Sequence, residues 1–552
     1  MIKRLLILSI LLTAIVLAIV TRFYKLGTAP AGLYLDEAGQ GYNAYSILKT
    51  GRDEFGKSFP FVFRSFIDFK TPVYVYLIVP LIPFFDLTPL TVRLPSFIFS
   101  ILTLPILFLL LRKLSPPKLA IPLSLLSTLL LAISPWHILF GRTNFECNVA
   151  LFFFLAGVYF FYKSLAKPIW LIPAAALFAV AIPAYHSQRI VTPAILIFLL
   201  IRYRQKLLAK NFRPFLILSL AIGLIISLPT ISIMFTPGFL ARAAGLNIFS
   251  SPHPAGFLDN YHGWWEWLVN NRIFLSTWEF ASLYVSYLSP RDMFLLGDYG
   301  PRSSFPELAT FYLWQFPFYL YGIYLLIKNK TLGELRTFLM AFLLIAPIPA
   351  ALTRDPYSTI RALPLVIPQL TIIALGMIFF WQKFSSKLWR WGMMIALAII
   401  VFYSLTKLYS SVIILNEFFR AKYWDYGWQK VVEVIQRDLD PKLPIVVDNS
   451  RFEPYSQLVF FLKYDPLKYQ HDNYEVPLNE YYANMNRNRT KIIGNIITRA
   501  IDWEHDLLAE QYLIGDELSI SYTQIKEHNL TLISEILYPD RSVAYRIVKI
   551  KK

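Results

Sequence analysis

The chain has 552 residues, of which 56% are hydrophobic and 16% charged, and its apolar residues recur in runs of roughly 16 to 22, the length that crosses a bilayer. This pattern excludes a soluble protein of the same size. The formal net charge of +18 comes from short Lys and Arg clusters between the apolar runs, which indicates cytoplasmic membrane anchors and argues against a nucleic-acid partner.

The first apolar run, Leu5 to Val20, follows Lys3 and Arg4. Residues 21–23 are Thr-Arg-Phe, which is not a small-residue cleavage site, so we interpret the run as a retained first helix and not as a signal peptide. The single cysteine, Cys147, excludes an intramolecular disulfide, a Cys-rich zinc site and an iron–sulfur cluster.

Apolar runs of this kind predict a polytopic all-α membrane bundle of about eleven transmembrane helices. The runs cover residues 5–22, 90–111, 119–138, 147–162, 168–184, 190–201, 214–234, 308–327, 337–353, 363–381 and 391–409. With the N-terminus in the cytoplasm, the cytoplasmic loops carry most Lys and Arg and only one acid, Glu334, whereas the opposite loops hold nearly every carboxylate. This asymmetry is the positive-inside signal, and it predicts a multi-pass protein of the cytoplasmic membrane.

Two of the predicted outer loops are long, covering residues 23–88 and 235–307. Within the first, residues 72–85 are apolar but short and contain three prolines. A full span here would invert all later loops, so we predict a re-entrant or interfacial helix.

After residue 409 the composition becomes that of a soluble domain, with charges of both signs and no apolar run of span length. Residues 428–439 have helical apolar spacing, and residues 444–448 and 542–550 have the composition of strands. Two domains are therefore predicted: a transmembrane domain, 1–409, and a small extracytoplasmic α/β domain, 410–552.

The first outer loop contains two adjacent acids, Asp36 and Glu37, about fifteen residues beyond the first helix. A carboxylate held near a membrane surface can serve as a base or a metal ligand. The simpler alternative is a pair of solvated loop acids.

Further charged groups fall on the same predicted face of the membrane. They are Arg64, Asp68 and Lys70; Arg142 and Glu146; His186 and Arg189; and Arg354, Asp355 and Arg361. Each group alone is also explained by a structural ion pair or by snorkelling side chains. Together they suit a reaction in which a carboxylate activates a nucleophile while cations hold the phosphate of a lipid.

No other catalytic set competes with these groups. The sequence has no HExxH, GxxxxGK[ST] or GxSxG motif, and its one DxD-like triplet, residues 438–440, lies at the end of a predicted helix.

Several short motifs follow one another along the first 380 residues. They are Asp36-Glu37, residues 68–72 (DFKTP), 92–96 (VRLPS), 134–136 (SPW) with Arg142 and Glu146, 185–189 (YHSQR), 287–290 (YLSP) and 361–364 (RALP). In their order and spacing, these motifs resemble the polytopic glycosyltransferases of the C superfamily. The likeness is greatest to the bacterial family related to protein O-mannosyltransferases and aminoarabinose lipid A transferases, and it covers most of residues 1–380.

The resemblance implies transfer of a sugar, mannose or a related hexose or pentose, from a polyprenyl-phosphate carrier to an acceptor outside the cytoplasm, with inversion. By position, Asp36 would be the base that deprotonates the acceptor hydroxyl, and Glu37 would orient the acceptor or the sugar. The residues expected to bind the donor phosphate and sugar are Arg142, Glu146, His186, Arg189, Arg361, Asp68 and Lys70. The acceptor stays open between lipid, protein and polysaccharide.

No obligatory cofactor is expected, although Asp36 with Glu146 could bind a divalent cation. A transporter or flippase for lipid-linked sugars is the alternative from a different class. The absence of an internal repeat and the placement of the charges at one edge of the membrane count against it. A polysaccharide polymerase or ligase would favour a large outer loop late in the chain, whereas here the extended acidic loop is the first.

Overall fold

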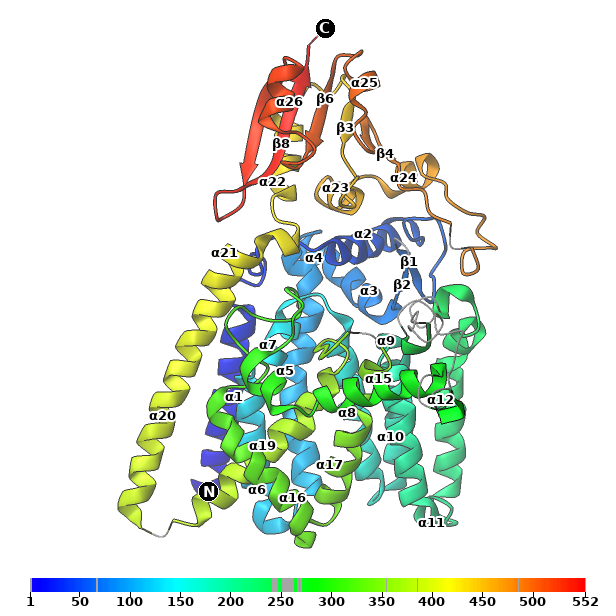
Figure 1. The fold of residues 1–552 in the computed structure, drawn as a ribbon. Helices are drawn as coiled ribbons and strands as arrows, with labels where there is room; N and C mark the ends of the chain where they lie inside the picture. Colours follow the sequence, from blue (N-terminus) through cyan, green and yellow to red (C-terminus); the bar gives the residue numbers. More distant parts are fainter. Residues whose placement is uncertain are drawn as a thin grey trace. The chain divides into compact units, whose positions relative to one another are not determined.

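The computed structural model describes residues 2–65, 68–240, 247–250, 263–265, 268, 271–353, 355–384, 386–484 and 486–551. The chain forms two compact units, each assembled from separate segments (Figure 1). Unit 1 comprises Met1–Tyr24, Ser96–Met234 and Leu240–Ser411, and unit 2 comprises Lys25–Pro95, Phe235–Phe239 and Val412–Lys552.

Unit 1 is a bundle of apolar helices, and described helices overlap every predicted span. They are α1 (Ile2–Phe23), α5 (Pro89–Leu114, whose first residues belong to unit 2), α6 (Pro117–Ala132), α7 (Pro135–Arg142), α8 (Glu146–Ser164), α9 (Leu171–Ala184), α10 (Gln188–Arg202), α11 (Arg204–Leu207), α12 (Arg213–Ile233), α15 (Arg272–Ser286), α16 (Phe316–Lys328), α17 (Glu334–Ile345), α18 (Ile348–Ala351), α19 (Val366–Gln382) and α20 (Lys387–Tyr409).

Small residues let two of these helices pack backbone to backbone. A Cβ atom added to Gly322 of α16 would lie 2.0 Å from the carbonyl oxygen of Ile372 in α19, and one added to Gly376 would lie 1.9 Å from the carbonyl oxygen of Phe318. Glycine at both positions is therefore required for the close approach of α16 and α19, a common device between membrane helices.

Seven helical segments in the described part of the chain are long and apolar enough to cross a membrane, and an eighth is added if α6 and α7, bent by 56°, form one span. Helices α9, α10 and α16 have 14, 15 and 13 residues. At 1.5 Å per residue they are shorter than the roughly 30 Å hydrocarbon core. The fold is thus a multi-pass helical bundle, and the number eleven stays a prediction.

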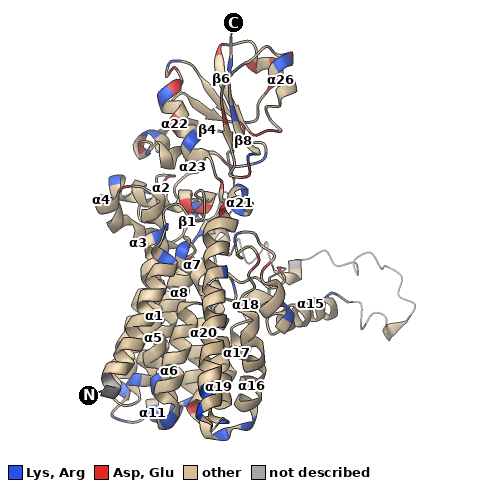
Figure 2. Cartoon of the chain, turned by 90° about the vertical axis from the view of Figure 1, so that its left-hand side faces the viewer, with Lys and Arg blue, Asp and Glu red and all other residues tan. Residues whose placement is uncertain are grey.

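Lys and Arg gather at one end of the bundle, the end at which the N-terminus and α11 lie (Figure 2). Arg202 and Tyr203 contact Glu334 there at 2.5 and 2.6 Å. This clustering is the one expected for cytoplasmic loops, and the orientation of the bundle in a membrane stays a prediction.

Unit 2 begins with the first predicted outer loop, which is largely folded. It forms α2 (Leu35–Thr50), a two-stranded hairpin of β1 (Phe63–Ser65) and β2 (Asp68–Lys70), and the short helices α3 (Pro72–Ile78) and α4 (Ile82–Phe85). The division predicted at residue 410 assigned this segment to the transmembrane domain, whereas the structure groups residues 25–95 with residues 412–552.

The C-terminal region of unit 2 is an α/β domain, as the sequence predicts. Its helices are α21 (Asn416–Arg420), α22 (Trp428–Asp438), α23 (Tyr455–Phe461), α24 (Pro466–Asp472), α25 (Trp503–Asp506) and α26 (Tyr522–Glu527), and its strands are β3 (Ile445–Val447), β4 (Lys491–Ile493), β5 (Ile496–Thr498), β6 (Gln511–Gly515), β7 (Thr531–Leu537) and β8 (Val543–Ile550). The strand order is β4-β5-β3-β6-β8-β7, with β3 parallel to β5 and β6 and the other pairs antiparallel.

Side chains of the central strand β3 alternate between two cores, as a pleated strand requires. Ile445 and Val447 pack in a core with Trp428 of α22 and Leu458 of α23, whereas Val446 packs on the opposite side of the sheet. Helix α23 also packs against α2, so this core reaches the first outer loop within the same unit.

Candidate functional site

Asp36 and Glu37 lie in the first turn of helix α2 and not in an irregular loop. The positive end of the helix dipole favours negative charge at these positions. Successive residues on a helix are rotated by about 100°, so two adjacent acids cannot point in the same direction. The two carboxylates accordingly have different surroundings.

Glu37 is buried, and both of its carboxylate oxygens accept hydrogen bonds. The Arg93 guanidinium donates Nε to Oε1 at 3.0 Å and Nη2 to Oε2 at 2.8 Å, and the backbone N–H of Tyr34 donates to Oε2 at 3.1 Å. Arg93 is itself buried and also donates to the carbonyl oxygens of Leu26, Pro30 and Gly32. Glu37 thus fixes the segment that leads into α2.

Asp36 is the accessible member of the pair, with 22% of its side chain exposed. Its Oδ2 lies 3.0 Å from Nζ of Lys70, the last residue of β2. The structure therefore brings together Asp36 and Lys70, two residues that the sequence motifs had singled out. Asp68 begins β2, but its side chain lies outside the described residues.

Arg142 is buried in unit 1 at the end of α7 and binds backbone. Its guanidinium donates to the carbonyl oxygens of Thr21, Arg22 and Tyr24 at 2.9, 3.0 and 2.8 Å. Carbonyls in the last turn of a helix have no partner within the helix, so Arg142 caps the C-terminal end of α1. Glu146, also buried, begins α8.

Arg22, in the last turn of α1, is a buried arginine that the sequence analysis does not identify as a candidate. Arg22 is completely buried and donates to the carbonyl oxygens of Leu131 and Ala132 at 3.1 and 2.8 Å, and its Nη2 lies 2.9 Å from Nδ1 of His137. Its position in an apolar helix is the sequence feature that indicates a buried role, because charged residues in membrane helices face the interior of the bundle.

The remaining candidate cations lie in unit 1 at the ends of other helices. His186 and Arg189 are half-buried where α9 leads into α10. Arg361 donates to Oγ1 of Thr353 at 2.7 Å and pairs with Asp355 at 2.5 Å. The Asp355 carboxylate is 60% exposed, so this ion pair is weakly held.

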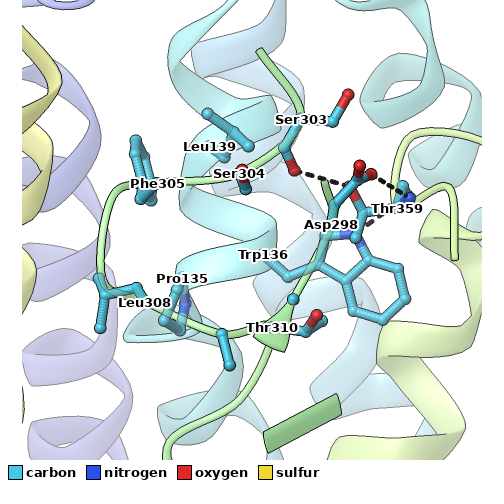
Figure 3. Close-up of a pocket in the computed structure, with 12 residues that line it drawn as sticks. Pro135, Trp136, Leu139, Asp298, Ser303, Ser304, Phe305, Leu308, Thr310 and Thr359 are labelled. Carbon is cyan, nitrogen blue, oxygen red and sulfur yellow. Dashed lines mark hydrogen bonds between the residues drawn. The ribbon is translucent and has the colours of Figure 1, made fainter. Parts of the chain in front are cut away.

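Asp298, which the sequence does not single out, binds Thr359 in the segment of unit 1 that precedes α19 (Figure 3). It accepts hydrogen bonds from the backbone N–H and the hydroxyl of Thr359, both at 2.7 Å, while Trp136 donates to the carbonyl oxygen of Thr359 at 3.0 Å. Burial raises the pKa of Asp298. These residues line a cavity of about 20 Å³, which has room for a single water molecule.

An apolar groove of about 340 Å³ lies in unit 1 among α8, α9, α10 and α12. Phe178, Leu196, Leu220 and Ile231 are among its lining residues, and its few polar groups are the hydroxyls of Ser219 and Ser227. A groove of this composition suits a hydrocarbon chain.

The candidate residues fall into two sets. Asp36, Glu37 and Lys70 belong to unit 2, and the set in unit 1 is Arg142, Glu146, His186, Arg189 and Arg361. Over the described residues, no group of three or more His, Cys, Asp or Glu side chains is arranged to hold a metal ion. Asp36 and Glu146, the pair considered for a cation, lie in different units.

Part of the sequence and the fold are similar to those of known glycosyltransferases. Residues 69–233 match the sequence model of the dolichyl-phosphate-mannose-protein mannosyltransferase family. The crystal structure of ArnT from Cupriavidus metallidurans bound to undecaprenyl phosphate matches with a TM-score of 0.51 at 11% identity, over 100% of this chain and 98% of that one.

The archaeal oligosaccharyltransferase AglB from Archaeoglobus fulgidus, in complex with an inhibitory peptide and a dolichol-phosphate, also matches with a TM-score of 0.51. The identity is 12%, over 98% of this chain and 74% of that one. No curated protein matches the sequence closely enough to count as a relative. At these identities the likeness establishes the fold, and the activity has to be argued from the site.

Proposed function

We propose that the protein transfers a sugar from a polyprenyl-phosphate carrier to an acceptor hydroxyl, with inversion at the anomeric carbon and Asp36 as the general base. The observation that carries this proposal is the contrast within one helical turn. Glu37 is buried against Arg93, whereas Asp36 keeps an accessible carboxylate at the start of α2. The shared fold with ArnT, solved with undecaprenyl phosphate, supports the choice of donor.

In this reaction an acceptor oxygen forms a bond to the anomeric carbon as its proton moves to Asp36. The bond between that carbon and the phosphate oxygen breaks, and its electron pair leaves with polyprenyl phosphate. A phosphate leaving group needs cations more than a general acid, because the negative charge grows on its oxygens. Arg189 and Arg361 are the proposed phosphate ligands, with His186 beside them.

Lys70 is the proposed positioning residue for the base. Its ammonium group lies 3.0 Å from Oδ2 of Asp36 and orients that carboxylate in the absence of substrate. Arg142 and Glu146 are proposed to stabilise the end of α1 near the donor, since Arg142 is engaged by backbone carbonyls. The acceptor is a lipid, protein or polysaccharide on the outer face of the cytoplasmic membrane.

The apolar groove among α8, α9, α10 and α12 is the proposed site for part of the isoprenoid chain. The chain would be held there by van der Waals packing against the apolar lining, because it exchanges lipid hydrocarbon, and not water, for the side chains of the groove. No metal ion or other cofactor is required in this scheme.

The test is sugar release by full-length protein in nanodiscs from radiolabelled polyprenyl-phosphate mannose, with glucose and pentose donors in parallel. The Asp36→Asn variant is compared with wild type, and Asp472→Asn, an exposed acid of α24, is the matched control. We expect Asp36→Asn to lose activity by about 100-fold or more, the usual contribution of a general base. Asp472→Asn should match wild type.

Full activity in a folded Asp36→Asn variant would reject Asp36 as the base. If wild type releases no sugar from any of the three donors, the transferase proposal fails. Flip of the lipid-linked sugar across the bilayer would then support the transporter alternative.

A further inference from the structure

The first turn of α2 depends on a residue that lies far away in the sequence. Tyr34, which precedes the helix, is not one of the residue types that cap a helix N-terminus well. The backbone N–H of Leu35 instead donates to Oδ2 of Asp425 at 2.8 Å, across 390 positions of the chain. Both residues belong to unit 2. The C-terminal region thus caps the N–H of Leu35, while Glu37 accepts from the N–H of Tyr34 within the same segment.

Gln457 holds the capping carboxylate in position. Nε2 of Gln457, a buried side chain of α23, lies 3.1 Å from Oδ2 of Asp425 and 2.9 Å from the carbonyl oxygen of Leu33. Gln457 therefore contacts both the capping carboxylate and the backbone just before α2. We call Asp425 and Gln457 the α2 clamp.

The main chain is closely packed where the segment before α2 meets the turn that contains Asp425. Gly32 has a φ of +102°, and a Cβ atom added there would lie 2.2 Å from the carbonyl oxygen of Trp424. Asp425 itself has a φ of +51°, a left-handed conformation that Asp tolerates better than most residues. The segment before α2 and the turn at residues 424–426 are thus packed main chain to main chain.

We propose that Asp425 and Gln457 are positioning residues for Asp36, which makes the C-terminal region a working part of the active site. This inference rests on the proposed function, in which Asp36 is the base. The cap is on the residue directly before Asp36, so the direction of the first helical turn, and with it the Asp36 carboxylate, is set by the clamp.

A positioning role has a kinetic signature that distinguishes it from substrate binding. The hydrogen bonds of the clamp go to the backbone at Leu33 and Leu35, directly before Asp36. Loss of the clamp should therefore lower kcat, which depends on the orientation of the base, and leave KM for the donor nearly unchanged.

The main variants are Asp425→Ala, which removes the cap, and Asp425→Asn, whose amide oxygen can still accept both hydrogen bonds. Asp502→Ala is the matched control, because Asp502 caps α25 through the N–H groups of Glu504 and His505 and is remote from α2 in sequence. Gln457→Leu removes the bridging amide while keeping Asp425, and it replaces Asp425→Ala if that variant does not fold.

Two measurements are made on each full-length variant in nanodiscs: hydrogen–deuterium exchange of the peptide covering residues 33–38, and steady-state sugar transfer. For Asp425→Ala we expect exchange in the first turn of α2 to rise at least tenfold. We also expect kcat to fall at least tenfold while KM stays within twofold. Asp425→Asn should recover most of both, and Asp502→Ala should change neither.

Unchanged exchange in Asp425→Ala would overturn the clamp, and faster exchange with unchanged kcat would overturn the positioning role. If wild type transfers no sugar, the proposed function fails and the clamp is judged without turnover. The readout is then the rate at which carbodiimide modifies the Asp36 carboxylate. That rate should change in Asp425→Ala and not in Asp502→Ala, and equal rates in the two variants would reject the inference.

Discussion

Arg93 and Glu37 form a two-bond ion pair in which Nε and Nη2 lie 3.0 and 2.8 Å from the two carboxylate oxygens, with at most 1% of either side chain exposed. Such a pair is costly to break from one side only, because the remaining charge stays buried without its partner. The pair joins the start of α5 to the start of α2 within unit 2.

We predict that Arg93→Met lowers the free energy of unfolding by about 3 to 5 kcal/mol, the usual cost of stranding a buried charge. The double variant Arg93→Met with Glu37→Leu should regain part of this loss, because no charge is left unpaired. The carbonyls of Leu26, Pro30 and Gly32 still lose their donor, so recovery stays incomplete. Thermal unfolding in detergent measures both effects, and a double variant no more stable than Arg93→Met would contradict the explanation.

Lys70 is predicted to act on kcat through its contact with Asp36. Lys70→Met should lower kcat by about tenfold to 100-fold, because the base loses the cation that orients it. Lys70→Arg, which keeps the charge, should retain more activity. An increase in donor KM alone, with kcat intact, would show that Lys70 binds the donor and not the base.

Arg361 is expected to exchange its carboxylate partner for the donor phosphate. Asp355 is 60% exposed and competes for the Arg361 guanidinium at 2.5 Å. Asp355→Asn should therefore lower KM for the lipid-linked donor, and Arg361→Ala should raise it about tenfold or more, the loss of roughly one charged hydrogen bond. Donor titrations in nanodiscs measure both. A KM that rises in Asp355→Asn would contradict this assignment.

Arg142 is predicted to affect stability more than donor binding. Its three hydrogen bonds to the end of α1 are made by a buried guanidinium, and Arg142→Ala should cost at least about 2 kcal/mol of unfolding free energy. Arg142→Lys should rescue only part, because an ammonium group cannot reproduce the planar fork. A variant of normal stability with a raised donor KM would instead favour direct phosphate binding.

The acids that follow α2 predict a dependence of stability on pH. Burial raises the pKa of Glu54 to about 8 and that of Asp53 to about 6. Oε1 of Glu54 accepts a hydrogen bond from Asn43 at 2.8 Å, while Oε2 has no hydrogen-bond partner among the described residues, as suits a protonated carboxyl group. Lys491 and Glu475 also face this group.

A carboxyl group with a raised pKa in the folded state stabilises the fold fully below its unfolded value, about 4.3 for Glu, and loses that contribution as pH rises through the folded value. Wild type should therefore lose stability between about pH 4 and 8. Glu54→Gln, neutral at every pH, should reduce this loss, whereas Glu480→Gln on the surface should not. Melting temperatures in detergent from pH 5 to 9 test this, and parallel curves for wild type and Glu54→Gln would reject it.

The helices of the bundle follow directly from the sequence, because hydrophobic run length and flanking Lys and Arg are local properties. The same holds for α22, whose apolar residues have helical spacing, and for β3 and β8, which lie within the longer strand-like stretches 444–448 and 542–550. By contrast, β4 and β5 are three residues each, too short to give a period.

The surroundings of Asp36 are harder to foresee. Tyr34 is not a favoured residue before a helix, and α2 contains Gly39 and Gly41, so the sequence favours a loop here. Its stability comes from tertiary contacts: Gly41 packs close to Phe460, and Leu35 is capped by Asp425. The pairing of Glu37 with Arg93 likewise joins residues 56 positions apart, and nothing in the spacing of the two residues predicts it.

The α2 clamp also sets an order of events during synthesis. Leu35 and Asp425 are 390 positions apart, and a ribosome adding about 5 to 20 residues per second needs roughly 20 to 80 s to make the intervening chain. During that interval the N–H of Leu35 lacks its Asp425 cap while the membrane helices are inserted. A nascent chain stopped before residue 425 thus contains every predicted span but has an unfinished helix at the proposed base.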